Sequence, residues 1–187
     1  MGIQKILVVL GSPRKNGNTT ILANQAIEGA KEADAEVENV RLQGLNIAPC
    51  NACDACRKSG HCTIDDDMIP LYDKIEKADA ILLASPVYWF NMSAQMKLFI
   101  DRTYAVESNG RYALTGKRIG IIMAYADSDP LESGAINAIH SFQDMCRFVK
   151  ADIVGIVHGC AEHPGEIEKR PEVLKAAHKL GKKLAGE

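Results

Sequence analysis

The sequence predicts an α/β protein in which helices cover both faces of a parallel sheet. Five short apolar segments alternate along the chain with five longer helical segments, which is the pattern of such a sheet. Most of the apolar segments are nearly continuous, as expected of strands buried on both faces. The 187 residues contain no internal repeat, low-complexity segment or linker, so we expect a single domain over residues 1–187.

The first half of the chain supplies two strands and two helix starts. Residues 3–10 are an apolar run that ends at Gly11, and after a polar turn an Ala-rich helix is expected from Thr19 to about Lys31. Residues 36–42 alternate as a short second strand. Residues 43–64 contain Gly, Pro and four cysteines, which predicts no regular element there. A helix start follows at Asp65, Asp66, Asp67 and Met68, because carboxylates accept hydrogen bonds from the free N–H groups of a first turn.

The second half supplies three strands and three helices. The predicted strands are 80–85, which Pro86 ends, 118–125 and 153–157. The predicted helices are 93–104, 134–148 and the basic amphipathic segment 171–184. Ligands of such sheets bind beyond the carboxyl ends of the strands, where the strand order reverses. The candidate loops are therefore 11–19, 85–92 and 125–134.

Composition excludes several classes of protein. A net charge of −2 and a pI near 6.2 argue against a nucleic-acid partner. No apolar run reaches the roughly 18 residues of a membrane helix, and the N-terminus leads into a strand without a cleavage site. We therefore expect a cytoplasmic protein without a membrane partner. In that reducing compartment, six cysteines are ligands, redox groups or core residues rather than disulfides.

The first candidate loop has the properties of an anion site. It lies between a strand and a helix N-terminus, where free N–H groups and the helix dipole attract a phosphate. Hydroxyl, amide and guanidinium donors accompany them, from Ser12, Arg14, Asn18, Thr19 and Thr20. The spacing is neither that of a dinucleotide fold nor that of an NTPase P-loop. The alternative is an ordinary turn with a polar cap.

The second candidate loop places Tyr88, Trp89 and Phe90 beside a proline at a strand end, in a chain with only 5% aromatic residues. A flat ring system could lie against such a surface, with backbone groups bonding to its edge. The alternative is that the three aromatics belong to the core. Three consecutive side chains cannot all face one way, so at least one is expected to border the cleft.

The segments GSPRKNGNTT and SPVYWFNMSAQMKLFIDR resemble the NADPH-dependent FMN reductase and iron–sulfur flavoprotein group of the flavodoxin-like superfamily. The resemblance is specific over residues 3–105 and looser beyond. It implies a flavodoxin-like three-layer sandwich with a five-stranded parallel sheet of order 2-1-3-4-5, and an assembly of two or four identical chains. It also implies FMN, with the first loop's donors at the phosphate. The residues implied at the flavin ring are Pro86, Val87, Tyr88, Trp89 and Asn91. Relatives often carry glycines where Ala126, Asp127 and Ser128 stand here, and Asp127 is taken as a further contact.

Four cysteines, Cys50, Cys53, Cys56 and Cys62, form a C-x2-C-x2-C-x5-C pattern in the cysteine-rich loop 45–64. Four thiolates so close in sequence suit a [4Fe–4S] cluster or a tetrahedral Zn²⁺, and the spacing favours iron–sulfur. The pattern, with Asp66-Asp67-Met68 after it, also resembles the cysteine motif of iron–sulfur flavoproteins, which implies a cluster that exchanges single electrons with the flavin. The thiols could instead hold nothing. Core packing is expected for Cys146 and Cys160.

These features lead to three functional hypotheses. The first is an enzyme that passes electrons from NAD(P)H through FMN to a quinone, a flavin or another acceptor, with no side chain required as general acid or base. The second is a one-electron transfer module served by ferredoxin through the cysteine cluster. The third is a binding domain stabilised by a zinc ion, in which the resemblance of the two loops to flavin-binding loops is coincidental.

Overall fold

The computed structural model describes residues 2–105, 107–108 and 111–187. Its central sheet has five parallel strands in the spatial order β2-β1-β3-β7-β8, which confirms the predicted order. The strands are β1 (Lys5–Leu10), β2 (Glu36–Arg41), β3 (Ala80–Tyr88), β7 (Arg118–Tyr125) and β8 (Asp152–Cys160). A sixth, two-residue strand, β4 (Asn91–Met92), turns back antiparallel on β3. Strands β5 (Glu107–Ser108) and β6 (Arg111–Tyr112) pair antiparallel in a separate two-stranded sheet.

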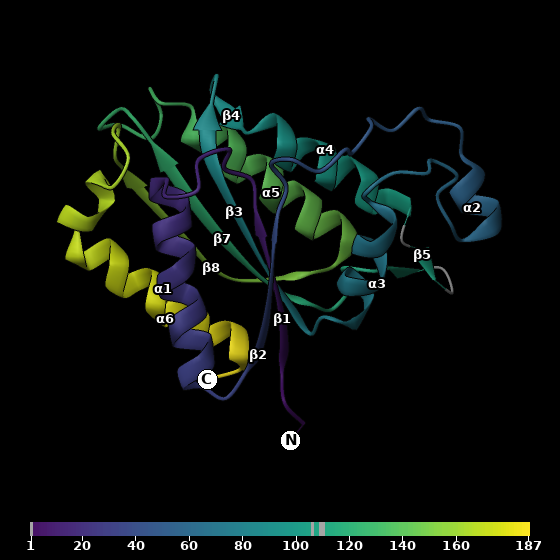
Figure 1. Ribbon diagram of the computed structural model, residues 1–187, viewed down its shortest axis with the longest axis horizontal. Helices are drawn as coiled ribbons and strands as arrows, with labels where there is room; N and C mark the ends of the chain where they lie inside the picture. The colour runs from purple at the N-terminus through teal and green to yellow at the C-terminus, as the bar shows by residue number, and fades with distance from the viewer. Residues whose placement is uncertain (1, 106, 109–110) are drawn as a thin grey trace.

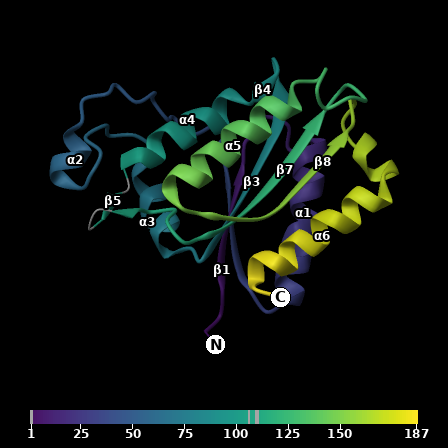
Figure 2. The same cartoon turned by 180° about the vertical axis from the view of Figure 1, so that it is seen from behind.

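Helices cover both faces of the sheet (Figure 1). One face carries α1 (Asn18–Glu32) and α6 (Pro171–Ala185), and the other carries α3 (Ile69–Lys77), α4 (Ala94–Arg102) and α5 (Ala135–Val149). Figure 2 shows the same three layers from behind. Each face has its own apolar cluster, because the strands bury side chains on both sides. Helices α1 and α6 cross closely: a Cβ at Gly181 would stand 1.9 Å from the carbonyl oxygen of Ala26.

Two sequence predictions about these elements were wrong. Strand β3 continues through Pro86 to Tyr88, with Pro86 opposite Ala124 of β7. The proline is tolerated because β1 ends at Leu10, opposite Ala84, so no strand remains on the β1 side of β3 to accept a hydrogen bond from the N–H that Pro86 lacks. The segment 43–64 also holds a regular element, the short helix α2 (Ala55–Ser59).

Other boundaries differ by a few residues. Strand β8 extends to Cys160, beyond the predicted end at residue 157. Helix α3 begins at Ile69, and Asp66 supports its start by accepting a hydrogen bond from the backbone N–H of Met68 at 2.9 Å. Two short 3-10 helices, η1 (Thr103–Ala105) and η2 (Glu166–Lys169), complete the described elements. Within the described part of the chain, none of the helices has the length and apolarity needed to cross a membrane.

Candidate functional site

A cavity of about 230 Å³ opens at the carboxyl edge of the sheet, where the strand order reverses between β1 and β3. Seven of the predicted contacts line it: Ser12, Arg14, Asn18, Thr19, Pro86, Val87 and Tyr88. The other predicted contacts, Thr20, Trp89, Asn91 and Asp127, lie outside its lining. Ala161 and Glu162 also line it and were not predicted. They follow the fifth parallel strand, so the rule that selected the other loops could have found them.

The N-terminus of α1 forms one end of this cavity. Gly17 caps the helix without a side chain, so the first backbone N–H groups of α1 have no partner within the helix. The loop before it is held by a hydrogen bond from the Arg14 N–H to Ser12 Oγ at 3.2 Å. The Arg14 side chain itself is exposed beside these donors. Together they offer positive potential and hydrogen-bond donors to an anion.

Asn18 connects the first loop to the segment after β8. Its side-chain amide donates to the carbonyl oxygens of Ala161 and His163, both at 2.9 Å, and accepts from the N–H of Ile167 at 3.3 Å. Because the side chain is used in this way, its backbone N–H is the group left for a ligand. Thr20 has a similar internal contact, since its hydroxyl lies 3.4 Å from the carbonyl oxygen of Arg14.

A buried network of hydroxyl groups joins the first and second loops. Ser93 donates to the carbonyl oxygen of Gly11 at 2.8 Å, and its N–H donates to Ser85 Oγ at 2.9 Å. The same Ser93 hydroxyl caps α4 by accepting from the N–H of Met96 at 3.3 Å. The two loops are therefore held at a fixed separation before any ligand binds.

The aromatic residues form the tip of a tight hairpin. Tyr88 pairs with Asn91, which leaves Trp89 and Phe90 as a two-residue turn with φ of 48° and 66°. Asn91 also accepts a hydrogen bond from the N–H of Met92 at 2.8 Å. All three aromatics are exposed, with Trp89 at 93%, so the interpretation of them as core residues was wrong. Only Tyr88 of the three lines the cavity.

The hairpin rests on the start of α5. A Cβ at Gly134 would stand 2.4 Å from the Cα of Phe90, and Gly134 has a φ of 76°. Asn137 donates to the carbonyl oxygen of Phe90 at 3.2 Å. In the third loop, Asp127 is exposed and accepts from the N–H of Asp129 at 3.3 Å, so its side chain supports the loop itself.

The far wall of the cavity contains Tyr125, whose hydroxyl lies 2.9 Å from Nδ1 of the exposed His158. Burial, followed by the neighbouring Cys160, raises the pKa of Tyr125, so the phenol stays neutral at ordinary pH. Cys160 is half-buried and its thiol donates to the carbonyl oxygen of Ala126 at 3.1 Å, so the prediction of core packing was wrong for this residue. Cys146 is buried in the core as predicted.

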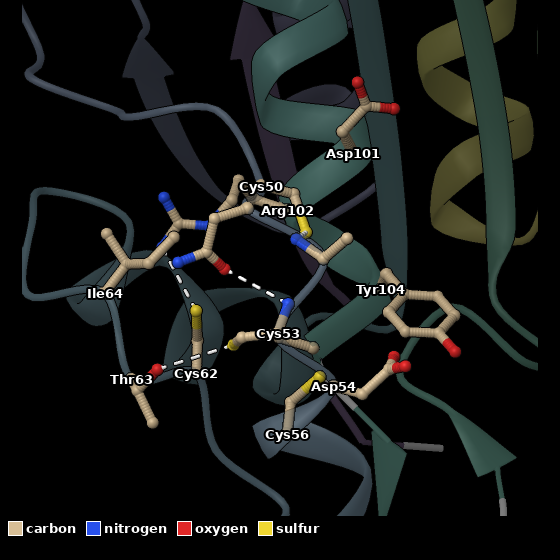
Figure 3. A pocket seen from close by; sticks show the side chains of 13 residues that line it. Cys50, Cys53, Asp54, Cys56, Cys62, Thr63, Ile64, Asp101, Arg102 and Tyr104 are labelled. Carbon is tan, nitrogen blue, oxygen red and sulfur yellow. Dashed lines mark hydrogen bonds between the residues drawn. The ribbon is translucent and has the colours of Figure 1, made fainter.

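A second cavity, of about 150 Å³, brings the four cysteines of the loop together (Figure 3). Cys50, Cys53, Cys56 and Cys62 all line it, and all four thiols are free. Among the described residues, no three Cys, His, Asp or Glu side chains converge on a point where a single metal ion could bind. A tetrahedral Zn²⁺ needs all its sulfur ligands about 2.3 Å from one point. An iron–sulfur cluster instead takes one thiolate at each of several irons, so its four thiolates need not meet at one point.

A buried ion pair supports this second cavity. Arg102, at the end of α4, donates to the two carboxylate oxygens of Asp66 at 2.5 and 3.2 Å, and both side chains are almost fully buried. Burial alone would raise the pKa of Asp66, but hydrogen bonds from Arg102 and from the N–H groups of Ala48 and Met68 outweigh it and lower the pKa. Arg102 was not predicted as a site residue, since arginine is usually exposed.

The four thiols are not equivalent. Burial raises the pKa of Cys56. Burial acts in the same direction on Cys62, but a hydrogen bond from the backbone N–H of Ile64, together with the positive charge and hydrogen bond of Arg102, outweighs it and lowers its pKa. Cys62 is thus the cysteine with the strongest local support for a thiolate.

The fold is that of a flavodoxin-like protein, with a cavity at the carboxyl edge of its sheet. The chain matches the sequence model of the NADPH-dependent FMN reductase family over residues 4–157, and it belongs to that family. It is therefore an FMN-dependent NAD(P)H oxidoreductase, and FMN and NAD(P)H are the cofactors of its family.

Individual proteins are also similar to this chain over most of its length. An iron–sulfur flavoprotein of Methanocaldococcus jannaschii is 32% identical over 97% of this chain and 95% of its own. An iron–sulfur flavoprotein of Archaeoglobus fulgidus is 37% identical over 97% of this chain and 79% of its own. Among solved structures, the Trp repressor binding protein of Bacillus subtilis superposes with a TM-score of 0.70 at 26% identity, covering 94% of this chain and 96% of that one.

Proposed function

We propose that FMN binds in the cavity at the carboxyl edge of the sheet, with its phosphate at the N-terminus of α1 and its ring against residues 86–88. The phosphate would accept hydrogen bonds from the backbone N–H groups that begin α1 and a charge-assisted bond from Arg14. One observation carries this proposal: the same cavity is lined by the start of α1, whose first backbone N–H groups have no partner within the helix, and by the end of β3, which carries Tyr88.

When bound, FMN would supply the redox chemistry, namely reduction by hydride from NAD(P)H and reoxidation, in two-electron or one-electron steps, by a small-molecule acceptor such as a quinone or a flavin. The protein's part is to bind and orient. Backbone groups of residues 86–88 would border the ring edge, and the Ser85, Ser93 and Gly11 network keeps that edge at a fixed position relative to the phosphate end. Trp89, Asn91 and Asp127 would contact the ring from outside the cavity lining.

The test is FMN binding by Arg14→Gln, measured by quenching of flavin fluorescence. Loss of a charge-assisted hydrogen bond is worth about 1.5–3 kcal/mol, so we expect roughly a 10- to 150-fold weaker Kd. Lys15→Gln is the matched control, since it removes the same charge from an exposed neighbour outside the cavity lining. Equal affinities in the two variants would contradict the phosphate position. Failure of both NADH and NADPH to bleach bound FMN anaerobically would contradict the donor.

We further propose that Cys50, Cys53, Cys56 and Cys62 hold a [4Fe–4S] cluster that exchanges single electrons with the flavin. The spacing of the cysteines, the cavity that all four thiols line and the similarity to iron–sulfur flavoproteins support this. The second candidate function follows from it: a module that receives single electrons from ferredoxin. Iron and acid-labile sulfide of about four each per chain, in protein purified anaerobically, are the expected result. Reduction of the flavin by ferredoxin but not by NAD(P)H would favour the second function.

We also propose that the whole chain acts as a single FMN-binding domain in the cytoplasm, assembled as a homodimer or homotetramer. Exposed apolar side chains in the second and third candidate loops, Trp89 at 93% and Leu131 at 67%, support an assembly that covers them. Light scattering coupled to size-exclusion chromatography would show the number of chains, and a monomer at all concentrations would contradict this part.

A further inference from the structure

The guanidinium of Arg102 makes hydrogen bonds to three residues in and next to the four-cysteine loop. Its side chain is 1% exposed, and it donates to the carbonyl oxygen of Ala48 at 2.8 Å and to Asp66, as well as to the sulfur of Cys62 at 3.4 Å. Ala48 precedes the first cysteine and Asp66 follows the last. One side chain therefore connects both ends of the loop to the C-terminus of α4, as Figure 3 shows for its bond to Cys62.

We propose that Arg102 is a positioning residue for the cluster, which holds the loop in its binding shape and raises the cluster's reduction potential through its N–H···S bond to Cys62. This inference rests on the cluster proposed above. It concerns a residue that belongs to neither the cysteine motif nor the flavin loops.

The effect on shape follows from the number of bonds that Arg102 makes. A planar guanidinium can direct its N–H groups to several acceptors at once, which a lysine cannot do. Without it, the buried carboxylate of Asp66 would lack its cation, and the carbonyl of Ala48 would lack its donor. The two ends of the loop would then no longer be fixed relative to each other, and cluster assembly would become less complete.

The effect on potential follows from charge. Reduction adds one negative charge to a cluster, and a hydrogen bond from a cation to a ligand sulfur stabilises that added charge. Burial strengthens the effect because water does not screen it. Of the four thiols, Cys62 alone has this donor among the described contacts. Asp66 offsets part of the charge of Arg102 but does not remove the hydrogen bond to sulfur.

The experiment compares wild type with Arg102→Gln and Arg102→Lys, all purified anaerobically with FMN bound. The readouts are iron and sulfide per chain, and the ratio of reduced to oxidised cluster at a fixed solution potential, followed by electron paramagnetic resonance. For Arg102→Gln we expect less iron and about a tenfold lower ratio, equal to a shift of about −59 mV for one electron. Arg102→Lys keeps the charge, so its iron content and its ratio of reduced to oxidised cluster should lie between those of wild type and Arg102→Gln. Arg147→Gln, which removes an exposed guanidinium from α5, should match wild type.

Each outcome decides the proposal. Full iron content and an unchanged ratio in Arg102→Gln overturn it, provided that this variant retains FMN and so is folded. If Arg102→Gln does not fold, Arg102→Lys decides: a ratio equal to wild type overturns the proposal, and a lower one supports it. If wild-type protein contains no iron, both the proposed cluster and this inference are wrong. If wild-type protein contains iron and the Arg102 variants match it in iron content and in the ratio of reduced to oxidised cluster, only this inference is wrong.

Discussion

The hydroxyl of Ser93 donates a hydrogen bond to the carbonyl oxygen of Gly11, 2.8 Å away and 82 residues distant in sequence. The contact is buried, and it joins the loop after β1 to the start of α4. A Cβ at Gly11 would stand 2.9 Å from Ser93 Oγ, so the close approach also requires a glycine there. The first and second loops, which both line the cavity at the sheet edge, are thus parts of one rigid unit.

Ser93→Ala is expected to lower both stability and FMN affinity. It leaves the Gly11 carbonyl without its buried donor and removes the cap of α4, which together cost about 1–3 kcal/mol. Urea denaturation and FMN titration measure the two effects. Ser141→Ala is the control, because Ser141 only bonds to a carbonyl oxygen of its own helix at 2.9 Å. Similar losses in both variants would show that the Ser93 network has no special role.

Trp89→Asn is expected to stabilise the flavin-free protein. Positive φ costs a residue with a bulky side chain about 1–2 kcal/mol, whereas asparagine adopts it more readily and suits a two-residue hairpin. Trp89 is 93% exposed, so little packing is lost in exchange. The free energy of unfolding should therefore rise by up to about 1 kcal/mol, while FMN binding weakens if Trp89 contacts the ring. A less stable variant would mean that the turn is not strained.

The ion pair between Asp66 and Arg102 predicts a loss of stability in acid. The pKa of Asp66 is lowered on folding from its ordinary value of 3.8, so its contribution is complete above that pH and disappears as the pH falls through the lower, folded value. The difference in unfolding free energy between wild type and Asp66→Asn should be constant from pH 5 to 8, at about 3–5 kcal/mol, and shrink below about pH 4. A difference that does not change with pH would contradict the ion pair.

Cys146 should resist alkylation in the folded protein. Burial raises the pKa of its thiol to about 11, and only the thiolate reacts readily. With iodoacetamide at pH 8, mass spectrometry should find Cys146 unmodified before unfolding and modified afterwards. The half-buried Cys160 serves as the internal comparison and should react in the folded protein. Equal labelling of both thiols in native protein would contradict the buried position.

The sequence was sufficient for the sheet and for most of the cavity lining. Continuous apolar runs identify strands buried on both faces, and the donors after residue 11 follow a strand directly, so their position at the sheet edge could be inferred. Residues 161–162 could also have been found, since they follow the fifth parallel strand directly. Their role depends on Asn18, whose side chain ties that segment to α1, and such long-range contacts leave no local pattern.

Other features depend on tertiary contacts, which the secondary-structure propensities of single residues do not predict. Aromatic residues favour strands, so nothing local predicts a tight turn at Trp89 and Phe90 with positive φ. The turn is specified instead by the pairing of Tyr88 with Asn91 and by the packing on Gly134. Arg102 belongs to the same class, because an arginine at the end of an amphipathic helix is ordinarily solvated.

Helix α4 is capped by Ser93, which joins the first two loops of the cavity at the sheet edge, and ends at Arg102, which bonds to both ends of the cysteine loop. Its nine residues span about 14 Å, and each residue turns the helix by about 100°. Inserting or deleting one residue would therefore rotate Arg102 away from Cys62 while Ser93 stayed in place. Natural relatives that keep both sites should accept changes of composition in this helix but not of length. An engineer moving the cysteine loop to another flavin-binding scaffold would have to transplant α4 with it, in the same helical phase.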